Sequence, residues 1–259
     1  MSFIDDILDF GKGLLGGDNL LGSVASIALT GYALNKISSS LNKDNSLSST
    51  AQATPQEPDR GVRLQVVPDS NHKVPVIYGS AYMGGIITDA EIANNNTEMY
   101  YCITICEKTG IKYSDDTQSS FTFEDIYFND QRMVFQSDGI TCDYTLDREG
   151  NVDRSQEGLV EVYCFNGNGD SPVVPDGYTN GSLVSAYNVM PSWTSNHYMT
   201  DLIFAIVKVT YNKEKNITSI PKLTFHMTND MTLPGDCVYD YMTSERYGAG
   251  IDPTEIYRE

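Results

Sequence analysis

Met99-Tyr-Tyr-Cys-Ile-Thr-Ile-Cys106 is the stretch of this 259-residue sequence that decides the expected fold. In an extended chain, Tyr101, Ile103 and Ile105 point to one face. The residues between them, which are nearly as apolar, point to the other face. A strand that is apolar on both faces is typical of the centre of a sheet with both sides covered. The stretch therefore predicts a buried central strand.

Shorter runs of similar character lie on both sides of this strand and are separated by residues that favour turns. No long amphipathic helix is expected between them, which favours an antiparallel sandwich or barrel. The predicted fold class is therefore mainly β with short helices. The other predicted strands are Arg63–Val67, Val74–Tyr78, Gly85–Ile92, Phe121–Phe128, Met133–Gln136, Leu159–Phe165, Leu202–Val209 and Leu223–Met227.

Residues 1–41 differ from this pattern, because their apolar residues recur at helical spacing. A first helical stretch is followed by a second from about Leu20 to Ile37, which is too short and too polar for a membrane span. Residues 42–61 contain almost no large apolar side chains and are predicted to be a linker. The N-terminal segment is therefore expected to dock away from the β-rich unit.

At the other end, the sequence changes period again between Asp236 and Tyr247. Val238, Tyr241 and Met242 recur at helical spacing, and Gly248 follows as a stop signal. Residues 62–227 are therefore expected to form the β-rich unit. Residues 228–259 are expected to form a helix that leads to a following domain or to the end of a fragment.

The charge balance restricts the partners of the chain. Seventeen Lys and Arg stand against thirty-five Asp and Glu, which gives a net charge of −18. Such a chain repels phosphate and anionic lipid, so affinity for DNA, RNA or a membrane surface is not expected. With 40% apolar residues, the composition also excludes wholesale disorder and a polytopic membrane protein.

No local pattern indicates catalysis, a metal or a cofactor, and the chain is expected not to be an enzyme. The five cysteines form no metal-binding spacing and are expected to be free thiols in a reducing compartment. The acidic segment Asp147–Asp153 lacks the spacing of a calcium loop, and its acids are predicted to be solvated loop residues. The scattered histidines His72, His197 and His226, and Trp193, are interpreted as packing or hydrogen-bonding residues.

Four stretches together resemble the central tail hub, or tip attachment, proteins of long-tailed, lambda-like phages. Val74-Pro-Val-Ile-Tyr-Gly79 with the following Gly-Gly turn is similar to the opening strand pair of the first hub domain. The others are the Cys106–Gly110 turn with Phe123–Asp130, the segment Trp193–Pro221 with its Met199–Ala205 strand, and the helix Cys237–Ile251 that ends in Tyr-Gly-Ala-Gly-Ile. The resemblance covers about residues 62–251.

The resemblance implies a tail-tube-like β-barrel or sandwich hub domain over 62–227, with a smaller β insertion within about 108–199. It implies a structural protein of the virion tail tip, assembled in the host cytoplasm, that joins the tail tube to the tip and takes part in host attachment. The implied partners are two further copies in a homotrimer, a distal tail protein, the end of the tape measure, and tip or fibre proteins. The resemblance does not imply receptor binding, because in family hubs the receptor-binding modules follow this helix.

A ring of three copies would carry a charge of about −54 around the channel through which DNA slides. The excess acid is expected on the lumen and the outer surfaces. The sparse cations, among them Arg60, Arg63, Lys73 and Arg132, are expected at contacts between chains. The alternatives are a secreted carbohydrate-binding β-sandwich that stacks sugars on Trp193, and a glycoside hydrolase that uses two carboxylates.

Overall fold

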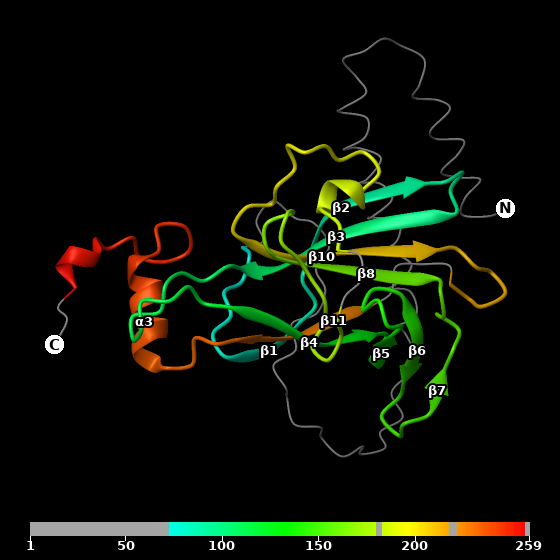
Figure 1. Ribbon diagram of the computed structural model, residues 1–259, viewed down its shortest axis with the longest axis horizontal. Helices are drawn as coiled ribbons and strands as arrows, with labels where there is room; N and C mark the ends of the chain where they lie inside the picture. The colour runs from blue at the N-terminus through cyan, green and yellow to red at the C-terminus, as the bar shows by residue number, and fades with distance from the viewer. Residues whose placement is uncertain (1–72, 180–182, 218–221, 257–259) are drawn as a thin grey trace, which may run out of the picture. The chain divides into compact units, whose positions relative to one another are not determined.

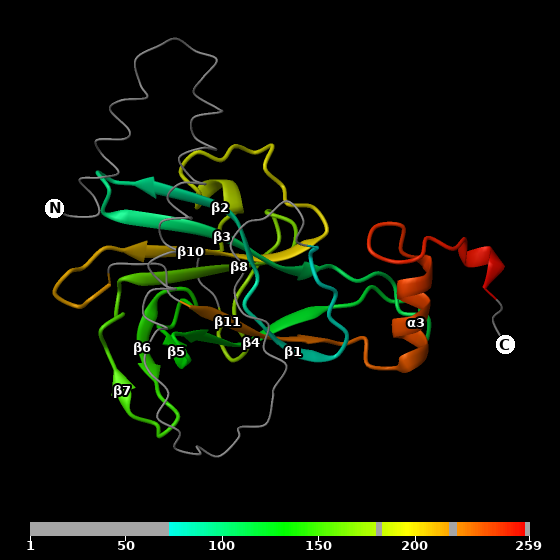
Figure 2. The same cartoon turned by 180° about the vertical axis from the view of Figure 1, so that it is seen from behind.

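The structure is a computed structural model that describes residues 73–179, 183–217 and 222–256. Two antiparallel sheets form the framework of this part of the chain (Figure 1; Figure 2). The predicted helices of residues 1–41, the linker 42–61, the strand Arg63–Val67, and Arg60, Arg63 and His72 lie outside the described residues.

The first sheet has the strand order β1-β11-β4-β5-β6-β7, and the second has the order β2-β3-β10-β8-β9. Every strand pair is antiparallel, and neither sheet closes into a barrel within the described residues. The mainly β prediction is therefore confirmed, with two open sheets in place of a barrel. The strands are β1 (Ser80–Met83), β2 (Ile86–Ala93), β3 (Glu98–Glu107), β4 (Phe121–Phe128), β5 (Gln131–Phe135), β6 (Cys142–Leu146), β7 (Val152–Asp153), β8 (Val160–Gly167), β9 (Pro172–Val173), β10 (Leu202–Thr210) and β11 (Leu223–Asn229).

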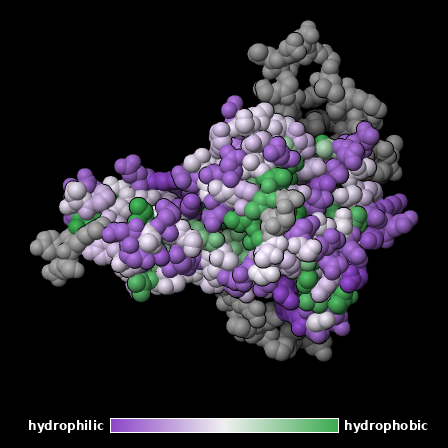
Figure 3. Space-filling model, viewed as in Figure 1, coloured by the Kyte–Doolittle hydropathy of each residue, from purple (hydrophilic) through white to green (hydrophobic). Residues whose placement is uncertain are grey.

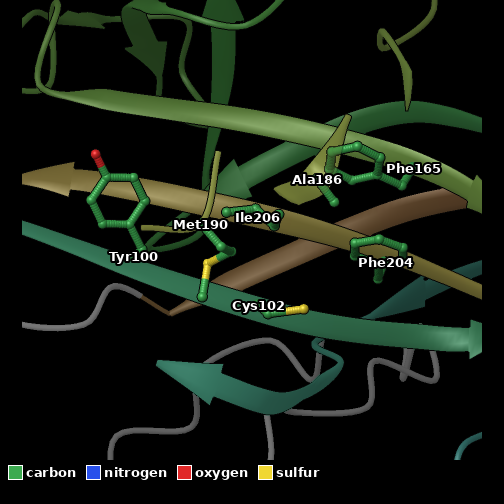
Figure 4. Packing of buried hydrophobic residues seen from close by; sticks show 7 residues of the cluster. All are labelled: Tyr100, Cys102, Phe165, Ala186, Met190, Phe204 and Ile206. Carbon is green, nitrogen blue, oxygen red and sulfur yellow. The ribbon is translucent and has the colours of Figure 1, made fainter. Parts of the chain in front are cut away.

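Strand β3 is the buried central strand that the sequence predicts. Its Tyr100 and Cys102 belong to an apolar cluster with Phe204 of β10 and Phe165 of β8 (Figure 4). The short 3₁₀ helix η1 (Ala186–Asn188) and the residues that follow it pack against this cluster. The alternate residues of β3, which point to the opposite face, are also fully buried: Tyr101, Ile103 and Ile105. Covering on both faces explains why β3 carries no charge between its two end residues, Glu98 and Glu107.

The structure differs from the sequence prediction at Val74–Tyr78, which is not a strand. The backbone of Pro75 accepts one hydrogen bond from the amide of Glu107 at 2.9 Å. Pro75 has no N–H to donate in return, which disfavours a regular ladder at this point. The strand of this region, β1, begins only at Ser80, and it pairs with β11.

The C-terminal helix also differs in its bounds. Helix α3 (Pro234–Thr243) begins two residues earlier than predicted, with Pro234 in its first turn, and ends before Tyr247. The chain then folds back, so that a Cβ atom on Gly248 would lie only 1.9 Å from the Tyr241 carbonyl oxygen. The close backbone approach explains the glycine at this position. In the described part of the chain, no helix is long and apolar enough to cross a membrane.

The region 108–199 contributes strands to both sheets. Strands β4 to β7 belong to the first sheet, and β8 and β9 belong to the second. Strands β6, β7 and β9 were not predicted, because β7 and β9 have only two residues each and β6 carries polar residues such as Asp143. Between β9 and β10, the chain crosses the outer face of the second sheet and covers the Phe204 cluster.

Candidate functional site: the α3 arm

Two segments leave the sheets together and form a projection, which we call the arm (Figure 1). It consists of residues 108–120, which connect β3 to β4, and residues 230–256, which follow β11 and contain α3. Residues 108–120 fold back on themselves through a bridge between Ile111 and Gln118. The rest of the described residues are called the body.

Helix α3 buries both of its aspartates and exposes two of its apolar residues. Asp236 and Asp240 are only 2% and 4% exposed, whereas Leu233 before the helix, Val238 and Tyr241 are 55%, 57% and 52% exposed. A surface helix ordinarily turns its apolar stripe towards the core. Figure 3 shows hydrophobic residues at the surface of the arm among more polar neighbours. The periodicity of Val238 and Tyr241 located the helix, but these two side chains face solvent.

The carboxylate of Asp240 holds the arm together. The hydroxyls of Tyr78 and Tyr247 both donate to its Oδ2 atom at 2.7 Å, and the amide of Gly110 donates to Oδ1 at 2.7 Å. Burial raises the pKa of both tyrosines well above their usual range, and the hydrogen bond to the Asp240 carboxylate raises it further. A Cβ atom on Gly110 would lie 2.7 Å from Asp240 Oδ1, so any other residue at this position would displace the carboxylate from its hydrogen bonds.

Asp236, one turn earlier, makes a second connection of the same kind. Its Oδ1 accepts the backbone amide of Ser114 and its Oδ2 accepts the hydroxyl of Ser114, both at 2.8 Å. Beside it, the rings of Tyr113 and Tyr239 lie 5.0 Å apart. Because residues 236 and 240 lie on one face of a helix, both carboxylates point to the 108–120 segment.

The base of the arm is also polar. The side-chain amide of Asn229, at the end of β11, donates to the Thr109 hydroxyl at 2.7 Å, and its carbonyl accepts the amide of Met231. Arg246 forms an ion pair with the buried carboxylate of Glu107 at the end of β3 and lies 3.9 Å from Asp201. Directional polar contacts therefore fix the arm on the sheets.

In the acidic segment Asp147–Asp153, residues 147–151 form a turn, and Val152 and Asp153 belong to strand β7. The carboxylate of Asp147 accepts the amides of Glu149 and Asn151 and the side-chain amide of Asn151. The hydrogen bonds from Asn151 lower the pKa of Asp147. Asp153 accepts from Ser155, and Asp143 pairs with Arg154. In the described ranges, no group of three potential ligands is arranged to hold a metal ion.

Trp193 and two histidines take part in packing and hydrogen bonding. The Trp193 indole donates to Asp89 at 2.8 Å, and its ring stacks on His197 and packs against the Phe204 cluster. His226 stacks on Tyr82 with ring centroids 4.3 Å apart and contacts the Ser80 hydroxyl at 3.0 Å. Because the Trp193 ring stacks on His197 and its indole N–H bonds to Asp89, little of the side chain remains available for stacking on a sugar.

The cysteines are free thiols. Cys102, Cys106, Cys142 and Cys164 are buried in the body, and Cys237 in the arm is half-buried. Burial raises the pKa of Cys102 and of Cys142 to about 12, which disfavours the reactive thiolate. These thiols therefore behave as small apolar side chains.

A cavity of about 300 Å³ lies where β4 and β5 separate. The turn at Asp176 fills part of this fork, and its amide donates to the Phe123 carbonyl oxygen at 2.7 Å. The Tyr178 hydroxyl accepts the amide of Phe135 at 2.9 Å. The charged side chains that line the cavity are those of Glu124, Asp125, Arg132 and Asp176.

Comparison with known proteins adds no relative: no family model matches the chain, and no curated protein matches it. A functional assignment therefore rests on the structure of the chain itself, above all on the arm. Its exposed apolar helix and its rigid polar anchoring are suited to contact with another macromolecule.

Proposed function

We propose that the chain is a structural component of a phage tail hub, which forms a ring around the DNA channel and joins the tail tube to the tip. Its partners are two further copies in a homotrimer and the neighbouring tail proteins, namely the distal tail protein, the tape measure end, and tip or fibre proteins. It acts in the virion, after assembly in the host cytoplasm, and the proposal assigns it no catalytic role.

The observation that carries this proposal is that the four hub-like stretches meet in the arm and at its contacts with the body. Asp240 belongs to the fourth stretch. Its carboxylate accepts hydrogen bonds from Tyr78 of the first stretch, Gly110 of the second and Tyr247 of the fourth. The third stretch contributes Asp201, whose carbonyl oxygen accepts the amide of Lys108 at 2.9 Å. Three motifs that build one joint, with the remaining one in contact beside it, support a resemblance in architecture.

The charge and the surface are consistent with the same role. A net charge of −18 suits a protein past which DNA must slide without binding. The exposed residues of α3 give the arm an apolar surface for a neighbouring chain. Of the cations predicted to lie between chains, Lys73 is exposed and Arg132 lies 3.4 Å from Asp125 within its own chain. Their contacts with other chains stay a prediction.

The proposal is tested in virus particles from a host that carries the gene. Peptides of this chain should be present in purified particles, and antibodies against the body should label the tail tip in electron micrographs. A gene deletion complemented with Asp240→Ala should give few complete tails, because the arm loses its anchor. Complementation with Asp143→Ala, which removes a half-buried carboxylate of the body paired with Arg154, should restore tails. Particles that lack the chain, or normal tails from the deletion, would refute the proposal.

A further inference from the structure

The apolar surface of the arm has an acidic rim. Residues 108–120 and 230–256 together contain eight carboxylates but only three cations, and six of the carboxylates are exposed, since only Asp236 and Asp240 are buried. Two of the cations are engaged within the chain, since Lys112 pairs with Asp115 and Asp230, and Arg246 pairs with Glu107. A partner surface must therefore combine exposed apolar side chains with basic ones.

Such a surface lies at the opposite end of the body, as both ribbon views show (Figure 1; Figure 2). We call it the distal loop surface, and define it as residues 92–97 and 211–217. The amide of Tyr211 donates to the Thr97 carbonyl oxygen at 2.8 Å, which holds the two turns together. Ile92 is 44% exposed and Tyr211 is 39% exposed.

Two exposed lysines, Lys213 and Lys215, lie beside Tyr211 in this loop. Among the residues that the structure describes, neither has a carboxylate partner within ion-pair distance. In a chain with twice as many acids as bases, a loop with two lysines and one glutamate is locally positive. The distal loop surface thus complements the arm in charge and carries exposed apolar side chains of its own.

We propose that the arm of one copy of this chain docks on the distal loop surface of a second copy. Val238, Tyr241 and Leu233 contact Tyr211 and Ile92, and the acidic rim of the arm faces Lys213 and Lys215. The contact is head-to-tail, because it joins two different surfaces. An open row of copies therefore always keeps one free arm at one end and one free distal loop surface at the other. Both surfaces of every copy are occupied only when the row closes into a ring. This inference rests on the proposed hub function and specifies its interface.

The experiment measures mass in solution by sedimentation velocity and light scattering. The arm variant carries Val238→Asp and Tyr241→Ser, and the distal variant carries Tyr211→Ser and Lys213→Glu. Neither change touches Asp236 or Asp240, so the arm keeps its anchors. Val152→Asp is the matched control, because Val152 is as exposed as Val238 but lies on β7.

The wild-type chain and the Val152→Asp control should associate to the same mass, and each interface variant alone should be monomeric. A mixture of the two variants should form a one-to-one dimer and nothing larger, because it contains only one intact pair of surfaces. Circular dichroism of each variant checks that the sheets are intact. A mixture that stays monomeric would overturn the inference, as would an arm variant that associates like the wild type.

The outcome can be separated from that of the hub proposal. If the wild type associates and the mixture of variants stays monomeric, the interface lies elsewhere and the tail location is untouched. If the chain is absent from particles, the hub proposal fails even when the dimer forms in the mixture. A wild-type chain that is monomeric at every concentration, or an arm that binds only a different tail protein, overturns the head-to-tail contact.

Discussion

In the body, the largest fully buried side chains are aromatic and aliphatic, among them Tyr101, Phe165, Phe204 and Phe225. In the arm, the most deeply buried side chains of the helix are two aspartates, and apolar residues lie in solvent. Apolar burial is strong but non-directional. Hydrogen bonds to a buried carboxylate contribute less net stability but fix distance and direction.

The difference indicates that the two regions of the chain use their apolar residues for different purposes. The body uses its apolar residues for its own folding. The arm uses polar residues to hold α3 in place, so that Leu233, Val238 and Tyr241 remain available to a partner. Substitutions in the two regions should therefore differ in how much they lower the free energy of unfolding and in how much of the chain they affect.

The largest effect is expected from Phe204→Ala in the body. Phe204 is fully buried and stacks on Phe165 with ring centroids 4.7 Å apart. The substitution should lower the free energy of unfolding by about 3–5 kcal/mol, since it removes apolar contact and leaves a cavity. Denaturant titration followed by circular dichroism measures this loss. Tyr198→Ala, at an exposed position, should change the same quantity by less than about 0.5 kcal/mol.

A smaller and local effect is expected from Asp240→Ala in the arm. It leaves the hydroxyls of Tyr78 and Tyr247 and the amide of Gly110 without their acceptor, at a cost of about 2–3 kcal/mol. Amide hydrogen exchange should accelerate in α3 and in residues 108–120 and stay unchanged in β3 and β10. Asp240→Asn, which keeps one acceptor oxygen, should cost less. Uniform acceleration across the chain would show that arm and body unfold as one unit.

The sequence predicted the body better than the arm. Strand β3 was predictable because eight consecutive residues are apolar on both faces. Most of the other long strands were also predicted. Strands β1, β6, β7 and β9 were missed, because β1, β7 and β9 have at most four residues each and β6 carries polar residues. Residues 1–72 lie outside the described ranges, so the helices and the linker predicted there stay predictions.

The Asp240 joint could not be predicted from local pattern. Tyr78 and Gly110 lie 162 and 130 residues from Asp240 along the chain. Hydrophobic periodicity also misleads in this helix, because it assigns the apolar stripe to the core and the aspartates to solvent. The hub-like stretches were the only signal, since each of three contains a residue that bonds to Asp240.

A change at alkaline pH should separate the tyrosines of the arm from the rest of the molecule. The pKa of Tyr78 and Tyr247 is raised in the folded state, so their stabilising contribution is complete below the unfolded pKa of about 10 and is lost as pH rises above it. The advantage in unfolding free energy of the wild type over the variant Tyr78→Phe/Tyr247→Phe should therefore shrink above about pH 10.

The buried cysteines also destabilise the folded state at high pH, but they are common to both proteins and cancel in the difference. Unfolding by denaturant at a series of pH values between about 7 and 11 measures the difference directly. A difference that stays constant with pH would mean that these hydroxyls ionise equally well in the folded arm, which would contradict their burial against Asp240.

The smallest effect on folding is expected from Val238→Ser, which tests the exposed side of the same helix. Valine and serine have similar helix propensities, so the substitution isolates the contribution of apolar burial at this position. Because Val238 is 57% exposed, the free energy of unfolding should change by less than about 0.5 kcal/mol in dilute protein. Asp236→Ser, two residues earlier on the buried side, should cost several times more, because it breaks both hydrogen bonds to Ser114. If Val238→Ser instead cost more than Asp236→Ser, the apolar residues of α3 would be part of the monomer's own core, and the contrast between arm and body would fail at the one helix on which it depends.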